Sequence, residues 1–545
     1  MKIVIIGGVA AGTKAAAKIS REDPTAEILI VTKGKYISYA GCGLPYYLSG
    51  VIEKPEDLIV NTPESFQGLT GAKVLTETEA TKVIPDEKLV IIKDADGNES
   101  QVNYDKLIIA TGADSIRPPI PGIDLEGVHF LRTPEDTYAL HSALQEGNIK
   151  RALVVGGGFI GLEAAENINK LGIRTVVIDM APQVLPGFDP EMAKFVENHL
   201  GEQGIPIFTG TMLKEIEGED GKVTRAVTDK RSMKVDLIVM SAGVRANTAF
   251  VQDIGLEFAP NRTIIVNEKL ETNLPDIYAA GDCATTRNAF TGEPAWSPMG
   301  SSANMQGRVL AQSLLGKDVI YRGSVGTAVV HLPGLNAAKT GFNMEQAKEA
   351  GFDPVSVTTV VDDKAHYYPD AGELYIKMIA DRETETFLGV QVLGKGAVDK
   401  VVDLGVMALY FKAKLSDLED LDLAYAPPFS TAIHPLVHTV NVLKNKLAGN
   451  MISITPTEYE EGAAEGYRLI DAHIQPANMP GVEYIDYEKM TEAPESIKPE
   501  EKLLLACAKG KRAYLTQNRL KSMGYDHTIV LEGGSLFNDI EQEQA

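Results

Sequence analysis

The chain is poor in cysteine. Its 545 residues include only Cys42, Cys283 and Cys507, which are too few for a disulfide scaffold and typical of a protein from a reducing compartment. The chain also has no excess of positive charge. The formal net charge of −23 opposes binding to nucleic acid or to an anionic membrane, because the whole surface repels both. An anionic substrate would therefore need a local basic patch.

Long apolar runs are also missing. No stretch approaches the roughly 18 apolar residues of a membrane span. The N-terminus starts directly on an apolar strand-like run, Lys2–Ile6, without the basic region and cleavage site of a signal peptide. We therefore expect a cytoplasmic protein of three or four domains, with no nucleic-acid or membrane partner and no metal site.

Two glycine-rich turns mark the first half of the chain, at residues 7–12 and 156–161. Each follows a short apolar strand and opens a helical pattern. Each helix then leads to a second strand-like run, 27–31 in the first case and 175–179 in the second. This strand–helix–strand order predicts two separate dinucleotide sites.

The second turn carries the full G-x-G-x-x-G pattern at Gly156, Gly158 and Gly161. Such glycines let the backbone approach a pyrophosphate, whose charge the helix N-terminus stabilises. Asp179 stands at the end of the next strand, where a carboxylate accepts hydrogen bonds from a ribose 2′-OH and repels a 2′-phosphate. The pattern favours NADH over NADPH. A glycine-rich turn without a ligand is the alternative.

The first turn departs from this pattern, because Val9 occupies the middle glycine position. Two later segments support it as a nucleotide site: a strand that runs into Thr111-Gly112, and a strand that ends at Asp282. The predicted cofactor-binding residues of the turn are Gly7, Gly8, Val9, Ala10 and Gly12.

These four motifs, in this order, resemble the pyridine nucleotide–disulfide oxidoreductases over residues 1 to about 448. The resemblance implies FAD and NADH as cofactors. It implies that the turn at Thr111 and Gly112 separates the flavin and nicotinamide domains, and that Asp282 holds the ribityl chain of FAD.

Cys42 lies between two glycines and just before Leu44-Pro45, a pair that suits the first turn of a helix. At a helix N-terminus the dipole would favour the thiolate. No second cysteine lies nearby, so Cys42 cannot form a dithiol pair. It must cycle alone through a mixed disulfide, a persulfide or a sulfenic acid. The alternative is a buried, inert cysteine.

The segment Cys42–Tyr47 resembles the coenzyme A–disulfide reductase branch of the family. The NADH oxidase and peroxidase branch also uses one cysteine, but typically has a His inside the first glycine turn, which this chain lacks. The resemblance implies that Tyr367 and Tyr425 of a dimerisation region reach the partner's cysteine. His434 is either an acid–base residue or structural, and Cys283 is expected to pack near the flavin.

Coenzyme A carries several phosphates, so its site needs cations. Lys14, Lys18 and Arg21 are spaced to share one helix face, although an ordinary solvated face has the same spacing. The predicted substrate-binding residues are Lys18, Arg21, Ser38 and Gly41. Gly41 and Asn61 depart from the Asn and Arg that are usual in the branch, so polysulfide or another small persulfide is an alternative substrate.

A strand-like run at 503–506, the sequence from Cys507 to Arg512, and a helical pattern from Ala513 to Met523 follow near the C-terminus. Cys-x-x-Gly-x-Arg between strand and helix resembles the rhodanese loop, in which backbone N–H groups and basic side chains stabilise a thiolate or persulfide. Four residues separate Cys507 from Arg512, whereas cysteine phosphatases have five. His473 stands where rhodaneses usually have Arg, and a degenerate structural domain is the alternative.

Both resemblances together predict an α/β protein with two Rossmann-like domains, an α+β dimerisation domain and a C-terminal α/β rhodanese-like domain. The expected ranges are 1–118 with 246–322 for FAD, 119–245 for NAD, 323–450 for dimerisation and 455–545 for the rhodanese-like domain. We expect a homodimer that reduces a small thiol persulfide or disulfide, with coenzyme A as substrate or bound thiol. An NADH oxidase or peroxidase, and a sulfur-trafficking or redox-sensing protein, are the competing hypotheses.

Overall fold

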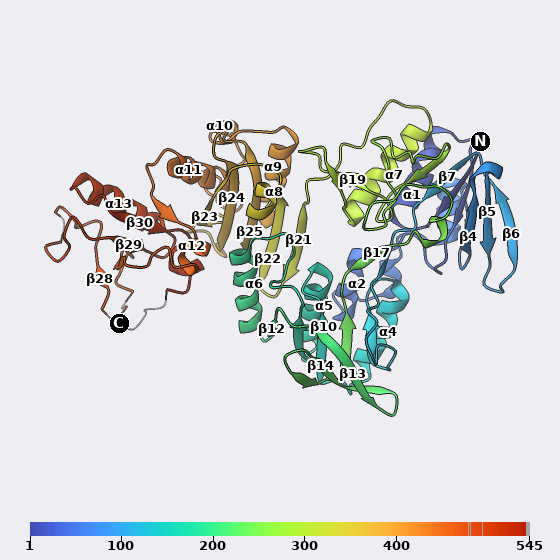
Figure 1. Ribbon diagram of the computed structural model, residues 1–545, viewed down its shortest axis with the longest axis horizontal. Coiled ribbons are helices and arrows are strands. Elements are labelled where there is room, and N and C mark those ends of the chain that lie inside the picture. The colour runs from blue at the N-terminus through green and yellow to red at the C-terminus, as the bar shows by residue number, and fades with distance from the viewer. Residues whose placement is uncertain (478, 480, 493, 541–545) are drawn as a thin grey trace. The chain divides into compact units, whose positions relative to one another are not determined.

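The computed structural model describes residues 1–540 except Asn478, Pro480 and Ala493 (Figure 1). The chain forms two compact units. The first comprises Met1–Val184 and Gly201–Ser324, and the second comprises Leu185–Leu200 and Val325–Ala545. No helix among the described residues is both long enough and apolar enough to cross a bilayer.

A five-stranded parallel sheet in the first unit has the order β18-β7-β1-β2-β3. Its strands are β1 (Lys2–Ile6), β2 (Glu27–Val31), β3 (Lys73–Leu75), β7 (Lys106–Ile109) and β18 (Ile277–Ala279). Helices α1 (Ala10–Glu22) and α7 (Gly300–Leu314) cross closely. A Cβ on Gly307 would lie 2.4 Å from the carbonyl oxygen of Ala11, so only glycine permits this approach. The predicted strands at 2–6 and 27–31 are confirmed.

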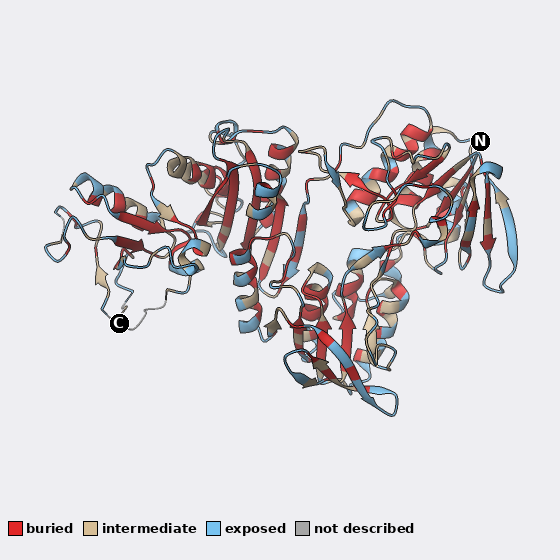
Figure 2. Ribbon diagram, viewed as in Figure 1, coloured by how far each residue is buried: buried red, intermediate tan, exposed pale blue. Residues whose placement is uncertain are grey.

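A second parallel sheet has the order β12-β11-β10-β16-β9. Its strands are β9 (Val128–Phe130), β10 (Arg151–Val155), β11 (Arg174–Ile178), β12 (Ile207–Phe208) and β16 (Leu237–Met240). Helices α4 (Pro134–Gln145) and α5 (Phe159–Lys170) accompany it. Figure 2 shows most residues of both parallel sheets buried. The chain therefore contains the two dinucleotide-binding folds that the glycine turns predict.

Smaller elements complete the first unit. They are α2 (Leu44–Leu48), α3 (Pro63–Thr70), the antiparallel strands β4 (Glu79–Ile84), β5 (Leu89–Lys93) and β6 (Glu99–Asn103), the meander β13 (Leu213–Glu219), β14 (Lys222–Thr228) and β15 (Ser232–Lys234), and the pairs β8 (Ala113–Ser115) with β17 (Val244–Ala246) and β19 (Thr286–Arg287) with β20 (Pro294–Ala295).

The second unit contains a five-stranded antiparallel sheet in the order β21-β22-β25-β24-β23. Its strands are β21 (Ala328–Leu332), β22 (Leu335–Gly341), β23 (Pro354–Asp362), β24 (Glu373–Asp381) and β25 (Phe387–Gly394). The helices around it are α8 (Met344–Glu349), α9 (Val398–Tyr410), α10 (Leu415–Leu418) and α11 (Pro435–Leu447).

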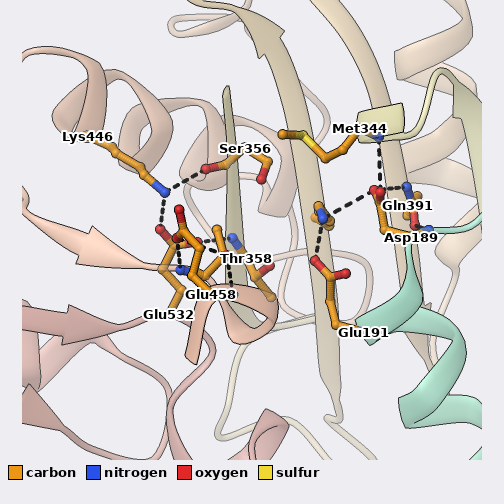
Figure 3. Close-up of polar contacts among 11 residues, drawn as sticks. Asp189, Glu191, Met344, Ser356, Thr358, Gln391, Lys446, Glu458 and Glu532 are labelled. Carbon is orange, nitrogen blue, oxygen red and sulfur yellow. Dashed lines mark hydrogen bonds and ion pairs between the residues drawn. The ribbon is translucent and has the colours of Figure 1, made fainter. Parts of the chain in front are cut away.

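The segment Leu185–Leu200, which includes most of α6 (Pro190–Glu202), belongs to this second unit although it lies inside the expected NAD-binding range. A buried charge cluster holds it there (Figure 3). Lys377 of β24 forms ion pairs with Asp189, at 3.2 Å, and with Glu191. Gln391 donates to Asp189 at 2.6 Å. Because these charges are buried away from water, their pairing with one another offsets the cost of desolvation.

The C-terminal residues form a third five-stranded parallel sheet, in the order β26-β30-β29-β27-β28. Its strands are β26 (Ser453–Ile454), β27 (Arg468–Asp471), β28 (Glu483–Tyr484), β29 (Leu503–Ala506) and β30 (Thr528–Leu531), with helices α12 (Pro456–Glu460), α13 (Lys511–Ser522) and α14 (Gly534–Phe537). The predicted strand at 503–506 is confirmed. The predicted helix is also present, and it starts two residues earlier than expected.

Candidate functional site

The two glycine-rich turns repeat one backbone geometry. Gly7 and Gly156 begin the turns with φ values of +113° and +120°. A Cβ on Gly7 would lie 2.1 Å from the carbonyl oxygen of Ala110, and a Cβ on Gly156 would lie 2.2 Å from that of Ser241. Both the positive φ and the missing space therefore require glycine at the first position of each turn.

The last glycine of each turn is equally constrained. A Cβ on Gly12 would lie 1.9 Å from the oxygen of Gly7, and a Cβ on Gly161 would lie 2.0 Å from that of Gly156. The middle position differs, because a Cβ on Gly158 would have no protein atom within 4 Å. The chain itself thus tolerates a side chain there, which explains how Val9 fits the first turn.

Asp179 is oriented toward the second turn by two backbone donors. One of its oxygens accepts the N–H of Gly157 at 2.6 Å, and the other accepts that of Ala181 at 2.8 Å. Each carboxylate oxygen keeps a lone pair for a further donor. This arrangement fits the ribose hydroxyls of NADH, as the sequence predicts, and it would repel a 2′-phosphate.

Asp282 lies just beyond β18 and has a partner that the sequence did not indicate. Arg132 donates to its carboxylate at 2.7 Å and to the carbonyl oxygen of Ala113 at 2.9 Å. Thr111 donates its hydroxyl to the carbonyl oxygen of Asn247 at 2.6 Å, and Gly112 has a φ of +67°. The glycine turn, Asp282 and the turn at Thr111 therefore converge on the carboxyl edge of one parallel sheet, where the flavin nucleotide fits.

Cys42 lies in a single 3-10 turn, Gly41–Gly43, directly before α2. Pro45 stands in the first turn of α2, so the predicted position at a helix start is confirmed. A Cβ on Gly300 would lie 3.9 Å from the Cys42 sulfur, and Gly300 is the first residue of the 15-residue helix α7. A second helix N-terminus that the sequence did not indicate therefore adjoins this thiol.

The pKa of Cys42 corrects one expectation. The helix-start argument predicts a lowered pKa, but the protein raises it. Cys42 is exposed as a whole residue, yet the atoms around its sulfur remove part of the hydration that a thiolate needs. Desolvation is the largest cause, and the carboxylate of Glu163 adds to it, whereas the charge of Arg132 lowers the pKa.

Glu163 is itself held in place, because the hydroxyl of Tyr46 donates to it at 2.8 Å. Burial raises the pKa of Tyr46 strongly, and the charge of Glu163 and the hydrogen bond to it raise this pKa further. Glu163 lies on α5, 121 residues after Cys42 in the numbering, and no local pattern in the sequence links the two.

Tyr367 and Tyr425 come together in the second unit. Both are exposed, at 67% and 49%. A hydrogen bond between the side chains raises the pKa of Tyr425, since the neutral phenol is the form that makes it. Both phenols are therefore available at the surface of this unit for a partner molecule.

His434 has a structural role in the described chain. It is buried, and its Nδ1 accepts the N–H of Leu436 at 3.2 Å, which caps α11. Burial and the charge of Lys400 lower the pKa of His434. Cys283 is fully buried, and its S–H contacts the carbonyl oxygens of Ile109 and Ala280 at 3.4 and 3.3 Å.

The expected basic patch on α1 is partly neutralised. Lys18 forms an ion pair with Glu22, which also binds Lys317 at 2.8 Å. Arg21 is exposed. Ser38 adopts a φ of +49° and accepts a hydrogen bond of 3.2 Å from Asn61. Gly41 is exposed. Because Lys18 is paired with Glu22 and Lys14 is partly buried, Arg21 is the exposed one of these three predicted cations.

Cys507 lies at the carboxyl end of β29 and is buried, at 3% exposure. Its sulfur accepts the N–H of Ala513 at 3.4 Å. The N–H of Ser535 donates to the Cys507 carbonyl at 3.0 Å. A Cβ on Gly534 would lie 2.0 Å from that carbonyl oxygen, which requires glycine beside the loop.

The basic side chains of this loop, which are expected to lie around the sulfur, form ion pairs with carboxylates. Arg512 binds Glu488 at 3.1 Å and Asp486 at 3.6 Å. Lys509 binds Asp362 at 2.6 Å and Glu373 at 3.3 Å. The N–H of Ala513 is the donor in contact with the Cys507 sulfur, and Nε of Arg512 is buried without a hydrogen-bond partner among the described residues.

Comparison with known proteins covers nearly the whole chain. The family model "Pyridine nucleotide-disulphide oxidoreductase" matches residues 1–304, and its dimerisation-domain model matches residues 327–437. An NADH oxidase of Methanocaldococcus jannaschii is 36% identical over 437 residues, which are 80% of this chain and 97% of that protein.

Two solved structures also match the C-terminal region. The NAD-dependent persulfide reductase from A. fulgidus superposes with a TM-score of 0.94 at 35% identity, covering 98% of this chain and 100% of the other. Reduced Bacillus anthracis CoADR-RHD superposes with a TM-score of 0.92 at 31% identity, covering 98% and 97%. The chain belongs to the pyridine nucleotide–disulphide oxidoreductases, a family of FAD- and NADH-binding enzymes.

Proposed function

We propose that this chain is an NADH-dependent reductase of coenzyme A persulfide or disulfide, or of polysulfide, in which Cys42 is the redox residue. The observation that carries the proposal is the local environment of Cys42. It is the exposed cysteine of the three, next to the first residue of α7 and in the unit that carries both dinucleotide folds. Cys283 is sealed in the core, and no dithiol pair is available.

The proposed reaction converts R–S–SH, NADH and H⁺ into R–SH, H₂S and NAD⁺. FAD, when bound, passes the two electrons of NADH to sulfur. The Cys42 thiolate attacks the inner sulfur of the substrate and forms a mixed disulfide as HS⁻ leaves. Reduction of that mixed disulfide releases the thiol. The N-terminus of α7 is proposed to offset part of the desolvation that raises the pKa of this thiol.

Tyr367 and Tyr425 are proposed to assist proton transfer to the departing thiol. Their exposure suits contact with a second subunit, as the dimerisation domain of the family implies. We propose a homodimer in which each tyrosine pair serves the partner's Cys42. Coenzyme A would be held near Arg21, Ser38 and Gly41.

The C-terminal sheet is proposed to be a rhodanese-like domain that carries sulfane sulfur on Cys507. Supporting observations are the parallel sheet, the strand–loop–helix order around Cys507, and the N–H of Ala513 on its sulfur. Both solved structures described above align with this region as well.

Purified enzyme with FAD and NADH should be offered coenzyme A persulfide, coenzyme A disulfide, polysulfide, O₂ and peroxide. NADH consumption should be fastest with one of the three sulfur acceptors, and Cys42→Ser should abolish it. Cys507→Ser should selectively lose persulfide on the C-terminal domain, measured by mass spectrometry. A clear preference for O₂ or peroxide would overturn the proposal.

An NADH oxidase is the second candidate, because the Methanocaldococcus jannaschii relative carries that name. In that case Cys42 would cycle through a sulfenic acid. The acceptor comparison decides between the reductase and the oxidase, since an oxidase would consume NADH when O₂ is the only acceptor supplied.

A further inference from the structure

A hydrogen-bonded chain of three side chains lies beside the Cys507 loop. Asp471, at the end of β27 and only 2% exposed, accepts the backbone N–H of His473 at 2.9 Å. The same oxygen lies 2.7 Å from Nδ1 of His473. On the other side of the ring, Nε2 lies 2.8 Å from the hydroxyl of Ser535. The order is therefore Asp471, His473, Ser535.

The hydrogen-bond partners of His473 determine which of its ring nitrogens carries the proton. The carboxylate of Asp471 only accepts hydrogen bonds, so the neutral imidazole of His473 carries its proton on Nδ1. The second oxygen of Asp471 is fixed by the N–H of Ala477 at 2.7 Å. Nε2 is then a free base that accepts the hydroxyl proton of Ser535, and Asp471 would stabilise the imidazolium that forms when Nε2 takes up a proton.

The position relative to Cys507 comes from the strand register. Asp471 pairs with Ala506, the residue before Cys507, and the N–H of Ala472 donates to Ala506 at 2.8 Å. Ser535 approaches from the other side, because its N–H donates to the Cys507 carbonyl. The exposed hydroxyl of Ser535 thus forms part of the rim of the loop.

Nucleophilic catalysis by Ser535 does not fit this geometry. An acyl-transfer site needs N–H donors that point at an oxyanion. The N–H groups of Ser535 and Leu536 are already engaged with the carbonyls of Cys507 and Ala508, at 3.0 and 3.1 Å. The three side chains are arranged to move a proton.

We propose that His473 is the general base and acid of sulfur transfer from Cys507 to an acceptor thiol. This inference rests on the proposed sulfur-carrying role of Cys507. Nε2 removes the proton of R–SH through Ser535, and the thiolate attacks the outer sulfur of the Cys507 persulfide. The new bond is RS–S, the bond between Cys507 and its sulfane sulfur breaks, and the imidazolium returns its proton to the Cys507 thiolate.

The neighbouring charges do not duplicate this role. Lys509 is bound to Asp362 and Glu373, and Arg512 is bound to Asp486 and Glu488. Arginine does not titrate in proteins and so cannot serve as a base. On β27, Asp471 belongs to the chain of three side chains and Arg468 is bound to Glu483 and Glu501, while Cys507 directly follows β29.

The test compares two acceptors in the full-length holoenzyme loaded with thiosulfate. An alkyl thiol is protonated near pH 7 and needs a base, whereas an aromatic thiol of low pKa is already ionised. His473→Gln and His473→Arg should each lower the ratio of alkyl-thiol rate to aromatic-thiol rate by about 100-fold. His473→Arg gives Asp471 a charged hydrogen-bond donor but supplies no base.

Persulfide on Cys507, measured by mass spectrometry for each variant, shows that the loop is still formed. Ser535→Ala should lower the same ratio, because it interrupts the path of the proton. An unchanged ratio in the His473 variants overturns the proposal, and so does a ratio restored by His473→Arg, since both outcomes indicate a structural role. If the wild-type enzyme forms no persulfide on Cys507, the sulfur-carrying function itself is wrong.

Discussion

The carboxylate of Glu532 accepts a hydrogen bond of 2.8 Å from the backbone N–H of Thr358 (Figure 3). Thr358 lies on β23, the edge strand of the antiparallel sheet, and Glu532 follows β30 of the C-terminal sheet. Lys446 and Ser453 each donate to the other oxygen of Glu532 at 2.6 Å. A buried carboxylate therefore covers the open edge of one sheet and joins the C-terminal sheet to it.

Glu532→Ala should weaken the contact between the C-terminal sheet and β23. The change leaves the buried N–H of Thr358 without its acceptor and removes the carboxylate partner of Lys446, whose ammonium keeps its hydrogen bond to the carbonyl oxygen of Ser356. We expect a cost of about 3 kcal/mol. Native-state hydrogen exchange at the Thr358 amide measures the effect directly. Glu532→Gln keeps an acceptor oxygen and should lose less.

Arg382→Ala is the matched control, because the ion pair of Arg382 with Asp353 is exposed, at 56% and 69%. It should change stability by no more than about 0.5 kcal/mol. Unchanged Thr358 exchange in Glu532→Ala would show that this contact contributes little.

Two glycines of the second turn, Gly161 and Gly158, should respond differently to alanine. Gly161→Ala places a Cβ 2.0 Å from the oxygen of Gly156, so the turn must shift. We expect a loss of about 1–3 kcal/mol in stability and weaker NADH binding. Gly158→Ala meets no protein atom within 4 Å and should keep its unfolding temperature. Thermal unfolding and NADH titration measure both, and equal destabilisation would contradict the geometry.

Local features of the sequence predicted much of the fold. The strands at 2–6, 27–31 and 503–506 and the helix start after Cys42 depend on residues within a few positions of one another. The spacing of each glycine turn likewise reflects contacts inside one strand–helix–strand unit. These features follow from backbone geometry and hydrophobic pattern alone.

Contacts between segments that are distant in the sequence could not be predicted from local patterns. Arg132 meets Asp282 across 150 positions, and Tyr46 meets Glu163 across 117. Both pairs form only after the parallel sheets assemble. Burial of the sulfur is the largest cause of the raised pKa of Cys42, and the charge of Glu163 adds to it, so the local helix-start argument alone does not give the direction of the shift.

Glu163→Gln should lower the pKa of Cys42. The protein raises this pKa, so the thiolate, and with it the rate of alkylation, increases with pH through a midpoint above the ordinary value for cysteine. Removing the charge of Glu163 moves that midpoint to lower pH. Iodoacetamide should react roughly threefold faster near neutral pH, because a larger share of the thiol is then ionised.

Prereduced enzyme is the sample for this measurement. The measurement is made in the Cys507→Ser background, because Cys507 is proposed to react with sulfur donors, and Cys283 is fully buried, so the modification reports on Cys42. Glu64→Gln, at an exposed position of α3, is the control and should leave the profile unchanged. A midpoint that stays or rises in Glu163→Gln would mean that Glu163 does not act on the thiol electrostatically.

The charge of Asp179 should set the preference for NADH. Asp179→Asn keeps an oxygen for the N–H of Gly157 but removes the charge that repels a 2′-phosphate. We expect kcat/KM for NADPH to rise relative to that for NADH by roughly tenfold, the equivalent of about 1.4 kcal/mol. Asp179→Ala also frees the N–H groups of Gly157 and Ala181, so it should raise KM for NADH further. Glu219→Ala, exposed on β13, should leave the ratio unchanged. If Asp179→Asn alters NADH and NADPH alike, the carboxylate orients the turn without selecting the cofactor.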